Sequence, residues 1–350
     1  MPSAVAQPAV SHPKKKLIRR ATPDHSQSLR RAFQWAFLML NVWIGVQFYL
    51  FVRYYETGGR TIQASRPPGV EGWLPIASLM NLKVLLSTGA MPRPHPAGMF
   101  LLIAFLTISW LLRKSFCSWL CPVGTVSESL WRLGKQTFGR NFSIPRRLDL
   151  ALRSLKYILL AVFLFAVGAM SATAIVAFLE GPYGVLDDVQ MLNFFRFLSV
   201  TGAVTLGVLI LASVFVQNFW CRYLCPYGAL LGLVSMASPL RIRRSESRCI
   251  DCGKCAQACP PALPVDRLIS IQSAECTGCL ECVAACPAAE ALWMSAPRRR
   301  VVPAWAFATA VALLFLGITG YGQWTGHWRT DLPSRIYFDL IPNASQLAHP

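Results

Sequence analysis

Eight of the twelve cysteines in this 350-residue chain form two consecutive copies of one spacing pattern. The copies are Cys249-x2-Cys252-x2-Cys255-x3-Cys259-Pro260 and Cys276-x2-Cys279-x2-Cys282-x3-Cys286-Pro287. A thiolate every third residue lets one loop surround a cubane of iron and sulfide and reach three of its irons, and the fourth cysteine of this pattern ligates the other cluster. The spacing therefore predicts two [4Fe–4S] clusters, one bound by Cys249, Cys252, Cys255 and Cys286 and the other by Cys276, Cys279, Cys282 and Cys259.

Zinc is the alternative for these eight cysteines, because paired C-x2-C motifs also form tetrahedral zinc sites. A third cysteine followed by a Cys-Pro pair, repeated as a whole, is not a zinc spacing. Gly253 and Gly278 lie inside the two loops, where backbone without a side chain can approach the sulfides. We therefore expect iron–sulfur chemistry, in which clusters pass single electrons without binding a substrate.

The remaining four cysteines form two copies of a second motif, C-x3-C-P-x-G. The copies are Cys117-x3-Cys121-Pro122-x-Gly124 and, 104 residues later, Cys221-x3-Cys225-Pro226-x-Gly228. Two cysteines four residues apart share one helical face, and the proline lets the chain turn away. Three uses of these thiols stay open: a third cluster or another thiolate-bound metal, a redox-active dithiol or disulfide pair, and reduced structural cysteines at a helix end.

The elements that position these motifs belong to a membrane protein. The chain is 54% hydrophobic and 14% charged, with a mean hydropathy of +0.43, which is too apolar for a soluble domain of this length. Five segments are long enough, or nearly so, to cross a hydrocarbon core of about 30 Å. They are residues 32–52, 96–112, 157–179, 198–216 and 303–321. Two interrupted apolar runs, 73–91 and 226–240, are expected to form helices that lie at the membrane interface.

The distribution of lysine and arginine predicts the orientation. Segments 1–31, 113–156 and 218–301 carry 26 of the 34 positive side chains, whereas segments 53–96, 180–197 and 323–350 carry 8. This bias predicts that the N-terminus and the cysteine-rich module are cytoplasmic and that the C-terminus is outside. Because the positive charge flanks the membrane instead of forming one stripe, anionic lipid headgroups are the expected partners and nucleic acid is not.

Each C-x3-C-P motif follows a span that has just returned to the cytoplasm. The first four spans therefore form two tandem hairpins that end in the same motif, a kind of repeat known among membrane proteins. If the two motifs met, they would present four thiolates, Cys117, Cys121, Cys221 and Cys225, at the inner membrane surface.

The paired C-x3-C-P motifs after membrane spans, followed by the double cysteine run, resemble the NapH/YccM-type membrane polyferredoxins. Related modules occur in NosR-like regulators and CcoG-like proteins, and the resemblance covers about residues 30–295. It implies a bacterial inner-membrane electron carrier that links the quinone pool, or a cytoplasmic reductant, to a partner oxidoreductase. The short segment after the fifth span does not match the immunoglobulin-like domain of CcoG-like proteins, and no flavin-binding domain precedes the first span as in NosR-like ones.

Other cofactor chemistry finds little support. None of the five histidines lies in an expected span, so paired histidine ligands for a haem between helices are lacking. His95, between Pro94 and Pro96, is expected to be a solvated turn residue. There is no P-loop, no G-x-G-x-x-G after a strand, and no constellation of nucleophile and base.

We therefore expect an α-helical membrane protein of about five transmembrane helices, with an inserted cytoplasmic α+β two-cluster ferredoxin domain. The expected parts are a disordered basic tail (1–31), a membrane domain (32–240), the ferredoxin domain (241–297), a fifth helix (298–322) and a short periplasmic tail (323–350). An electron-transfer component is favoured over a stand-alone enzyme. The alternatives are a membrane reductase that acts on quinone or an oxidised metal ion at the C-x3-C-P cysteines, and an accessory protein that senses redox state. Electron direction and the partner stay open.

Overall fold

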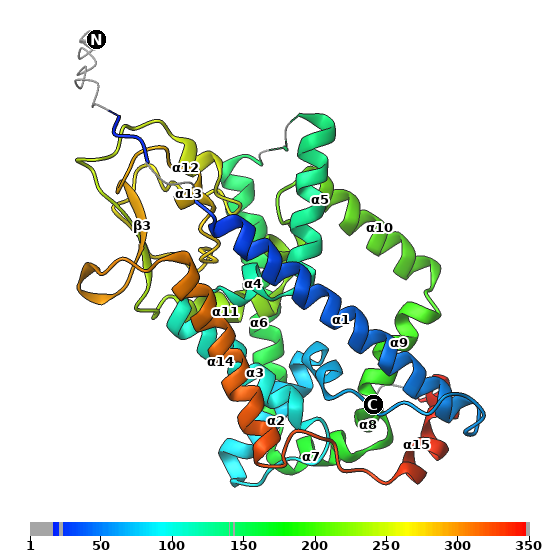
Figure 1. Ribbon diagram of the computed structural model, residues 1–350. Helices are drawn as coiled ribbons and strands as arrows, with labels where there is room; N and C mark the ends of the chain where they lie inside the picture. The colour runs from blue at the N-terminus through cyan, green and yellow to red at the C-terminus, as the bar shows by residue number, and fades with distance from the viewer. Residues whose placement is uncertain (1–16, 21–23, 140, 143, 348–350) are drawn as a thin grey trace, which may run out of the picture.

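The structure is a computed structural model that describes residues 17–20, 24–139, 141–142 and 144–347. Most of these residues are helical, and the strands form one small sheet at the end of the molecule where the cysteine-rich loops lie (Figure 1). Residues 1–16 and 21–23 of the expected basic tail lie outside the described residues.

Three helices are long and apolar enough to cross a membrane. They are α1 (Ser26–Glu56), the stretch Arg147–Ala169 of α6 (Arg146–Ala169), and α14 (Ala304–Trp324). A fourth candidate is the pair α9 (Asp187–Arg196) and α10 (Val200–Phe215), which is bent by 83° at its break. By length and composition the described residues thus hold three or four spanning helices, fewer than the expected five.

The expected span over 96–112 is a helix with these bounds, α3 (Pro96–Leu112), and at 17 residues it is shorter than the three candidate spanning helices. Twelve of its 17 residues are buried, including Ala104, Phe105 and Ile108, whereas Trp110 is exposed. It packs against α14, against α2 (Pro75–Thr88), and against α11 (Pro226–Ser235). An α-helix that is apolar on every side lies in a protein core or spans a membrane, so hydropathy alone does not distinguish these two settings for α3.

Two expected boundaries were wrong. The span expected over 157–179 is two helices, because α6 ends at Ala169 and Ser171 caps a new helix, α7 (Ala172–Glu180), by accepting a hydrogen bond from Ala174 N at 3.1 Å. The tail expected to be disordered through residue 31 is helical from Ser26, where α1 begins. Residues 18–20 also pair with the cysteine-rich module, through Ala289 N to Ile18 O at 2.8 Å and Arg20 N to Pro287 O at 3.2 Å.

The other described helices are short. They are η1 (Pro68–Trp73), α4 (Phe116–Trp119), α5 (Pro122–Phe138), α8 (Pro182–Val185), the π-helical turn η2 (Trp220–Leu224), α12 (Lys254–Gln257), α13 (Glu281–Ala284), η3 (Pro297–Arg299), α15 (Ser334–Leu340) and η4 (Ile341–Gln346).

The sheet supports the two cysteine loops. β1 (Arg241–Arg244) lies between β2 (Ser270–Ile271) and β3 (Leu292–Ser295), and both pairings are antiparallel. Ile242 stands opposite Ile271 on one side and Met294 on the other, and all three are buried. Alternation of buried and less buried residues along β1 gives the sheet one core face, which covers the loops.

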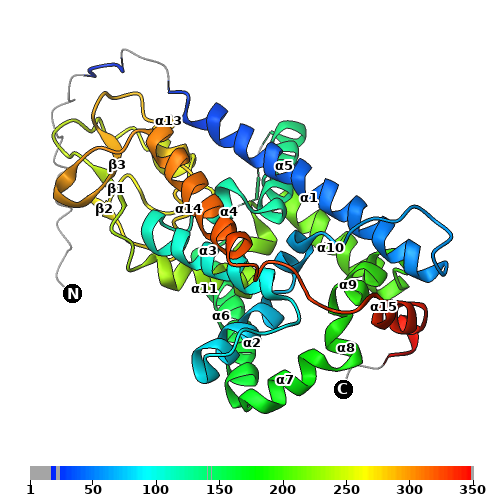
Figure 2. The same ribbon diagram turned by 60° about the horizontal axis from the view of Figure 1, so that its bottom comes forward.

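The segments expected on the two sides of the membrane gather at opposite ends of the molecule. The sheet, α12 and α13 lie at one end of α1, whereas α8, α9 and α15 lie at the other (Figures 1 and 2). At the latter end Arg66 binds Asp188 at 2.7 Å and Glu71 at 2.6 Å, and Thr330 donates to Glu71 at 2.8 Å. Three segments that are far apart in the sequence are thereby joined.

His95 belongs to this outer network and is not the solvated residue that the sequence predicted. It is 1% exposed, its Nδ1 lies 3.0 Å from the Arg66 guanidinium, and its Nε2 lies 2.7 Å from the carbonyl oxygen of Gly184. The prolines on both sides of His95 correctly indicated that the chain turns there. They could not indicate that the distant segment around residues 181–188 covers His95.

Candidate metal centres

Each C-x3-C-P-x-G motif builds the start of a helix on its second cysteine. Cys121 is the N-cap of α5 and Cys225 is the N-cap of α11, with proline as the first helical residue in both. The glycine N–H donates to the cysteine sulfur, at 3.4 Å from Gly124 to Cys121 and at 3.2 Å from Gly228 to Cys225. A helix N-terminus favours negative charge. At Cys121 burial nevertheless raises the pKa of the thiol, and the hydrogen bond from the Gly124 N–H opposes this shift.

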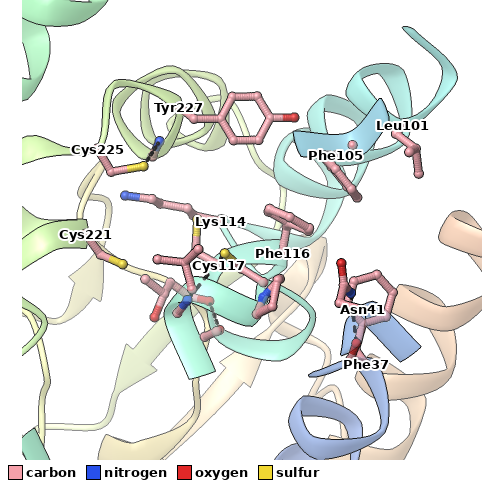
Figure 3. Close-up of a pocket in the computed structure, with 18 of the residues that line it drawn as sticks. Phe37, Asn41, Leu101, Phe105, Lys114, Phe116, Cys117, Cys221, Cys225 and Tyr227 are labelled. Carbon is pink, nitrogen blue, oxygen red and sulfur yellow. Dashed lines mark hydrogen bonds between the residues drawn. The ribbon is translucent and has the colours of Figure 1, made fainter. Parts of the chain in front are cut away.

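The two motifs meet in space. Cys117, Cys121, Cys221 and Cys225, which we call the quartet, line one cavity of about 500 Å³. Three of them, Cys117, Cys221 and Cys225, can be followed in Figure 3 around this space. Among the described residues no three His, Cys, Asp or Glu side chains converge closely enough for a single metal ion. The four thiols share one cavity.

Lys114 also borders this cavity, and its side chain points toward Cys221 and Cys225 (Figure 3). Lys114 is 4% exposed. Burial disfavours its ammonium, but Cys117, Glu275 and Cys225 together raise the pKa of Lys114 above its ordinary value. Burial also raises the pKa of Cys117 to about 11, although Lys114 opposes this shift. Sequence reasoning missed Lys114, and its position three residues before Cys117 was the only local signal.

Glu275 brings a carboxylate to the same region from the cysteine-rich module. Both of its oxygens accept hydrogen bonds from Lys156 at 2.7 Å, and one accepts a hydrogen bond from Tyr157 at 3.1 Å. Lys156 is fully buried. Burial would raise the pKa of Glu275, but Lys114 and Lys156 lower it below its ordinary value.

The second predicted ligand set lines a cavity of its own. Cys276, Cys279 and Cys282 come from one loop and Cys259 from the preceding motif, and all four line a small space covered by Ile242 and Leu280. The pKa of Cys259 is raised by burial and by its neighbours Cys279 and Cys276. Cys259 thus lies with the cysteines of the following motif, as the predicted exchange of fourth ligands requires.

The first predicted set lies nearer the surface. The pKa of Cys286 is raised by burial and by the nearby Cys252 and Cys249. The pKa of Cys255 is likewise raised by burial and by Cys286. Cys252 is solvent-exposed, whereas Cys255 is buried.

Both loops wrap their middle cysteine in the same backbone conformation. Asp251 and Gly253 flank Cys252 with φ of 55° and 70°, and Gly278 and Leu280 flank Cys279 with φ of 62° and 60°. When successive residues alternate between the right-handed and the left-handed conformation, their backbone N–H groups point into one concavity. Such a concavity binds anions, including iron–sulfur clusters. Glycine suits two of these four positions because it adopts positive φ without strain.

The loop of the second set is fastened to the membrane domain next to the quartet. Ser118 Oγ donates to the carbonyl oxygen of Thr277 at 2.7 Å, and Trp119 Nε1 donates to that of Gly278 at 3.2 Å. Both donors lie within the first C-x3-C-P motif. Cys279 also lines the quartet cavity, so the second set and the quartet are neighbours.

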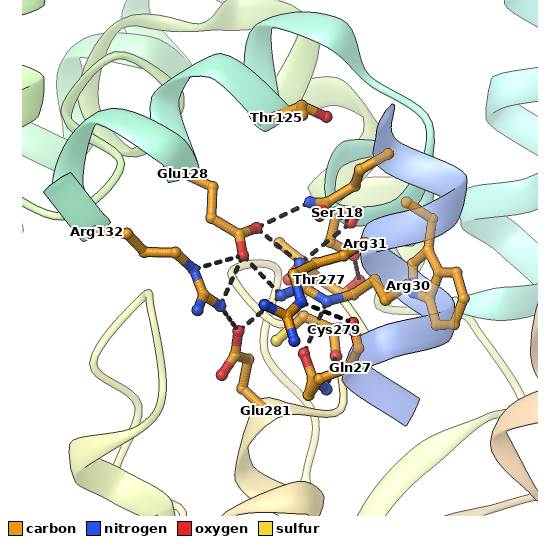
Figure 4. A network of polar contacts seen from close by, with 12 residues as sticks. Gln27, Arg30, Arg31, Ser118, Thr125, Glu128, Arg132, Thr277, Cys279 and Glu281 are labelled. Carbon is orange, nitrogen blue, oxygen red and sulfur yellow. Dashed lines mark hydrogen bonds and ion pairs between the residues drawn. The ribbon is translucent and has the colours of Figure 1, made fainter. Parts of the chain in front are cut away.

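A buried ionic network strengthens this contact (Figure 4). Arg30, which is 1% exposed, binds Glu128 of α5 at 2.7 Å and Glu281 of the module at 2.6 Å. Arg132 bridges the same two carboxylates. Gln27, one turn before Arg30, donates to the carbonyl oxygen of Cys279 at 3.0 Å. The first turns of α1 thus hold the loop of the second set against α5.

Comparison with known protein families assigns both kinds of motif. Residues 94–141 and 198–245 match the family described as a 4Fe-4S binding domain, and each match includes one C-x3-C-P motif and the helix before it. Residues 242–294 match the family described as a 4Fe-4S dicluster domain, which includes all eight cysteines of the double run.

The chain is also similar to individual proteins along most of its length. It is 47% identical over 326 residues to YccM of Escherichia coli (strain K12), which is named as a candidate electron transport protein, and the match covers 91% of both chains. The methylamine utilization ferredoxin-type protein MauN of Methylorubrum extorquens is 31% identical over 193 residues, which are 54% of this chain and 61% of MauN. The ferredoxin-type protein NapH of Escherichia coli is 25% identical over 151 residues, 42% of this chain and 48% of NapH. No solved structure matches the chain.

Proposed function

Because this chain belongs to the family of NapH/YccM-type membrane polyferredoxins, we propose that it carries three [4Fe–4S] clusters and passes electrons between its ferredoxin module and the membrane. It is a membrane-associated iron–sulfur protein with a role in electron transfer. The proposed ligands are Cys249, Cys252, Cys255 and Cys286 for the first cluster, Cys276, Cys279, Cys282 and Cys259 for the second, and Cys117, Cys121, Cys221 and Cys225 for the third.

One observation carries the third cluster: four cysteines from two repeats line one cavity beside the loop of the second set. The surroundings fit an anionic cluster, because Gly124 and Gly228 donate N–H groups to two of the sulfurs and the buried ammonium of Lys114 faces the cavity. A cluster bound there would supply one-electron chemistry at the membrane surface. The residues themselves hold the group, exclude water and set its electrostatic surroundings.

The exposure of the first set and the neighbours of the second set support an order of transfer. Cys252 of the first set is exposed, so a soluble donor or acceptor can approach the first cluster. Cys259, Cys276 and Cys282 of the second set are buried. Cys282 has Cys255 of the first set as an electrostatic neighbour, and Cys279 lines the quartet cavity, so the second set adjoins both of the others. We propose that electrons move along this line, with the first cluster facing the aqueous partner and the quartet facing the membrane.

The location follows from charge. The segments that carry most of the lysine and arginine include all twelve cysteines, so we propose that the three clusters lie on the cytoplasmic side of the bacterial inner membrane. The N-terminus would then be cytoplasmic and the C-terminus periplasmic.

A second candidate function is supported by the shape of the quartet cavity. The cavity extends from the quartet between α1, α3 and α14, where it is lined by Phe37, Ile44, Leu101, Phe105, Phe315 and Leu316. An apolar chamber that reaches a redox centre suits a lipophilic electron carrier of the quinone class. In that case the protein itself would reduce or oxidise quinone at the quartet.

The test of electron transfer uses the full chain, purified without oxygen and placed in lipid nanodiscs. Light-driven reduction by a water-soluble flavin supplies electrons, and a lipophilic quinone in the bilayer accepts them. In wild type the clusters become reduced and are reoxidised by the quinone. In the double variant Cys117→Ser, Cys221→Ser, the eight other cysteines still bind their clusters, but reoxidation by the quinone slows at least about tenfold, equivalent to about 1.4 kcal/mol of barrier.

The iron content of both proteins is the control. If the double variant loses the quartet iron and its remaining clusters are still reoxidised by quinone at the wild-type rate, the quartet does not lie on the path to the membrane. If wild-type clusters are reduced and quinone never reoxidises them, the quinone-reductase candidate is wrong, and a protein partner must accept the electrons.

A further inference from the structure

The ammonium of Lys114 faces the quartet without a polar partner of its own. Its Nζ forms no hydrogen bond or salt bridge with any residue that the structure describes, although Lys114 is 4% exposed. A Cβ atom placed on Gly228 would lie 3.6 Å from Lys114 Nζ and 3.5 Å from Cys225 Sγ, so these two atoms border the same space. Glu275, which acts electrostatically on Lys114, is already paired with Lys156, so an anion in front of Lys114 would add to the compensation of this buried cation.

Positive charge exceeds negative charge around the quartet. Lys156 is paired with Glu275, and Asp149 is shared by Arg153 and Arg222 at 2.7 Å each. Arg222 lines the cavity, and Arg153 donates to the carbonyl oxygen of Pro261, which also lines it. Arg30 and Glu128 also line the cavity, and they form a salt bridge with each other. Apart from this pair, the surroundings hold four cations against two carboxylates: Lys114, Lys156, Arg153 and Arg222 against Glu275 and Asp149.

The buried charges beside the second set are balanced. Arg30 and Arg132 face Glu128 and Glu281, with two cations for two carboxylates. Salt bridges join all four residues into one network, whereas Lys114 forms no salt bridge with the residues that the structure describes and acts on Glu275 from a distance. The quartet thus has an excess of positive charge that the second set lacks. Of the cations in this excess, Lys114 is the one whose side chain points toward the thiols.

We propose that Lys114 favours the reduced, more negative form of the quartet cluster, so that an electron that reaches the second cluster moves on to the quartet. This inference rests on the proposed function. In the step, the second cluster loses one electron and the quartet cluster gains it; no bond forms or breaks, and no proton moves. Charge near a cluster shifts its reduction equilibrium, and burial leaves little solvent to screen that effect.

The two repeats differ at this position. Counting 104 residues on from Lys114 leads to Asn218, which also lines the cavity and carries no charge. The thiols and glycines of the motifs are therefore repeated, but the lysine is supplied by the first repeat alone. A role confined to folding the motif would be expected in both copies, whereas a single charge is enough to bias one cluster.

The test is a redox titration of the full chain, purified without oxygen and followed by electron paramagnetic resonance. The quartet signal is the one that the double variant Cys117→Ser, Cys221→Ser removes. In Lys114→Met the reduction equilibrium constant of the quartet falls at least about tenfold, which is about 59 mV for a one-electron couple. Lys114→Arg keeps the charge and keeps the wild-type equilibrium, and Lys135→Met, at an exposed site on α5, leaves it unchanged.

Glu275→Gln should have the opposite effect. It removes a carboxylate from the same surroundings, so the reduction equilibrium constant of the quartet cluster should rise. It decides the matter if Lys114→Met fails to assemble the quartet cluster. Three results would overturn this inference and leave the third cluster standing. They are an unchanged reduction constant in Lys114→Met, a fall in Lys114→Arg as large as that in Lys114→Met, and a lowered constant in Glu275→Gln. Wild-type protein with only the two ferredoxin signals and about eight irons, the content of two cubanes, would overturn the third cluster and this inference together.

Discussion

The glycine that ends each C-x3-C-P-x-G motif supplies a backbone N–H to the cysteine sulfur three residues before it. In the first motif the glycine also has no room for a side chain, since a Cβ atom on Gly124 would lie 2.4 Å from the carbonyl oxygen of Cys117. The turn that carries Cys117 is therefore packed directly against the first turn of α5, and the distance between Cys117 and Cys121 depends on that contact.

Gly124→Ala should displace Cys117 from its place in the quartet, because the backbone carbonyl must move to admit the methyl group. We expect loss of about four irons per chain, the content of one cubane, with both ferredoxin clusters retained. Iron analysis and spectroscopy of the reduced protein measure this. Gly45→Ala in α1, where nothing lies within 4 Å of the added Cβ, is the matched control. Full iron content in Gly124→Ala would show that the packing of this turn does not position a ligand.

For single residues, the sequence allowed predictions only where the spacing of nearby residues determines the arrangement. The ligand loops around Cys252 and Cys279 are local, and their spacing alone grouped the eight cysteines. Lys114 and Glu275 are 161 residues apart in the sequence, and no pattern in either segment indicated that they meet beside the quartet. The burial of His95 escaped prediction for the same reason, because the residues that cover it come from a distant segment.

At the element scale, the first turns of α1 connect the cysteine-rich module to α5. Arg30 makes this connection by binding Glu128 and Glu281 while almost fully buried. Burial would raise the pKa of Glu128, but its contacts with Arg30 keep the pKa below its ordinary value. Removal of one partner from a buried ion pair leaves the others uncompensated, at a cost of about 3–5 kcal/mol.

Arg30→Met should therefore loosen the loop of the second cluster without unfolding the membrane helices. We expect backbone amides of residues 273–282 to exchange with deuterium at least tenfold faster, about 1.4 kcal/mol in opening free energy, with the other regions unaffected. Arg31→Met, at the exposed neighbouring position, serves as the control. Equal exchange in both variants would mean that the network does not hold the loop.

The elements themselves were predicted unevenly. Hydropathy located helices in all five expected spans, but it could not separate the buried core helix α3 from a helix that faces lipid. Hydropathy also missed the helix break at Ser171, because a single capping serine barely changes the mean hydropathy of a segment as long as a membrane span. The prediction that α1 begins only at residue 32 failed because its first turns face the module and α5, so they are polar although they are helical.

At the scale of the whole molecule, the lysine- and arginine-rich segments and the cysteine module lie at one end and the other connecting segments lie at the opposite end. Arg66, Asp188 and Thr330 join three of those latter segments, and Lys156 and Glu275 join two of the former. A membrane between the two ends is consistent with this separation, and the bias of 26 against 8 positive side chains predicts which end is cytoplasmic.

Reporter fusions test this orientation. A reporter fused after Met294 should be active only in the cytoplasm, and one fused after Pro350 only in the periplasm. The reverse result at both sites would show that the protein has the opposite orientation in the membrane. Two fusions on the same side would instead show that α14 does not cross the membrane.

The iron content of the protein distinguishes three clusters from two. Full-length protein purified without oxygen should contain about 12 irons per chain, four for each cubane held by four cysteines. The double variant Cys117→Ser, Cys221→Ser should contain about 8, with both ferredoxin signals intact. About 8 irons in wild type, together with rapid labelling of all four quartet thiols, would contradict the proposed function and leave the quartet as a dithiol or structural site.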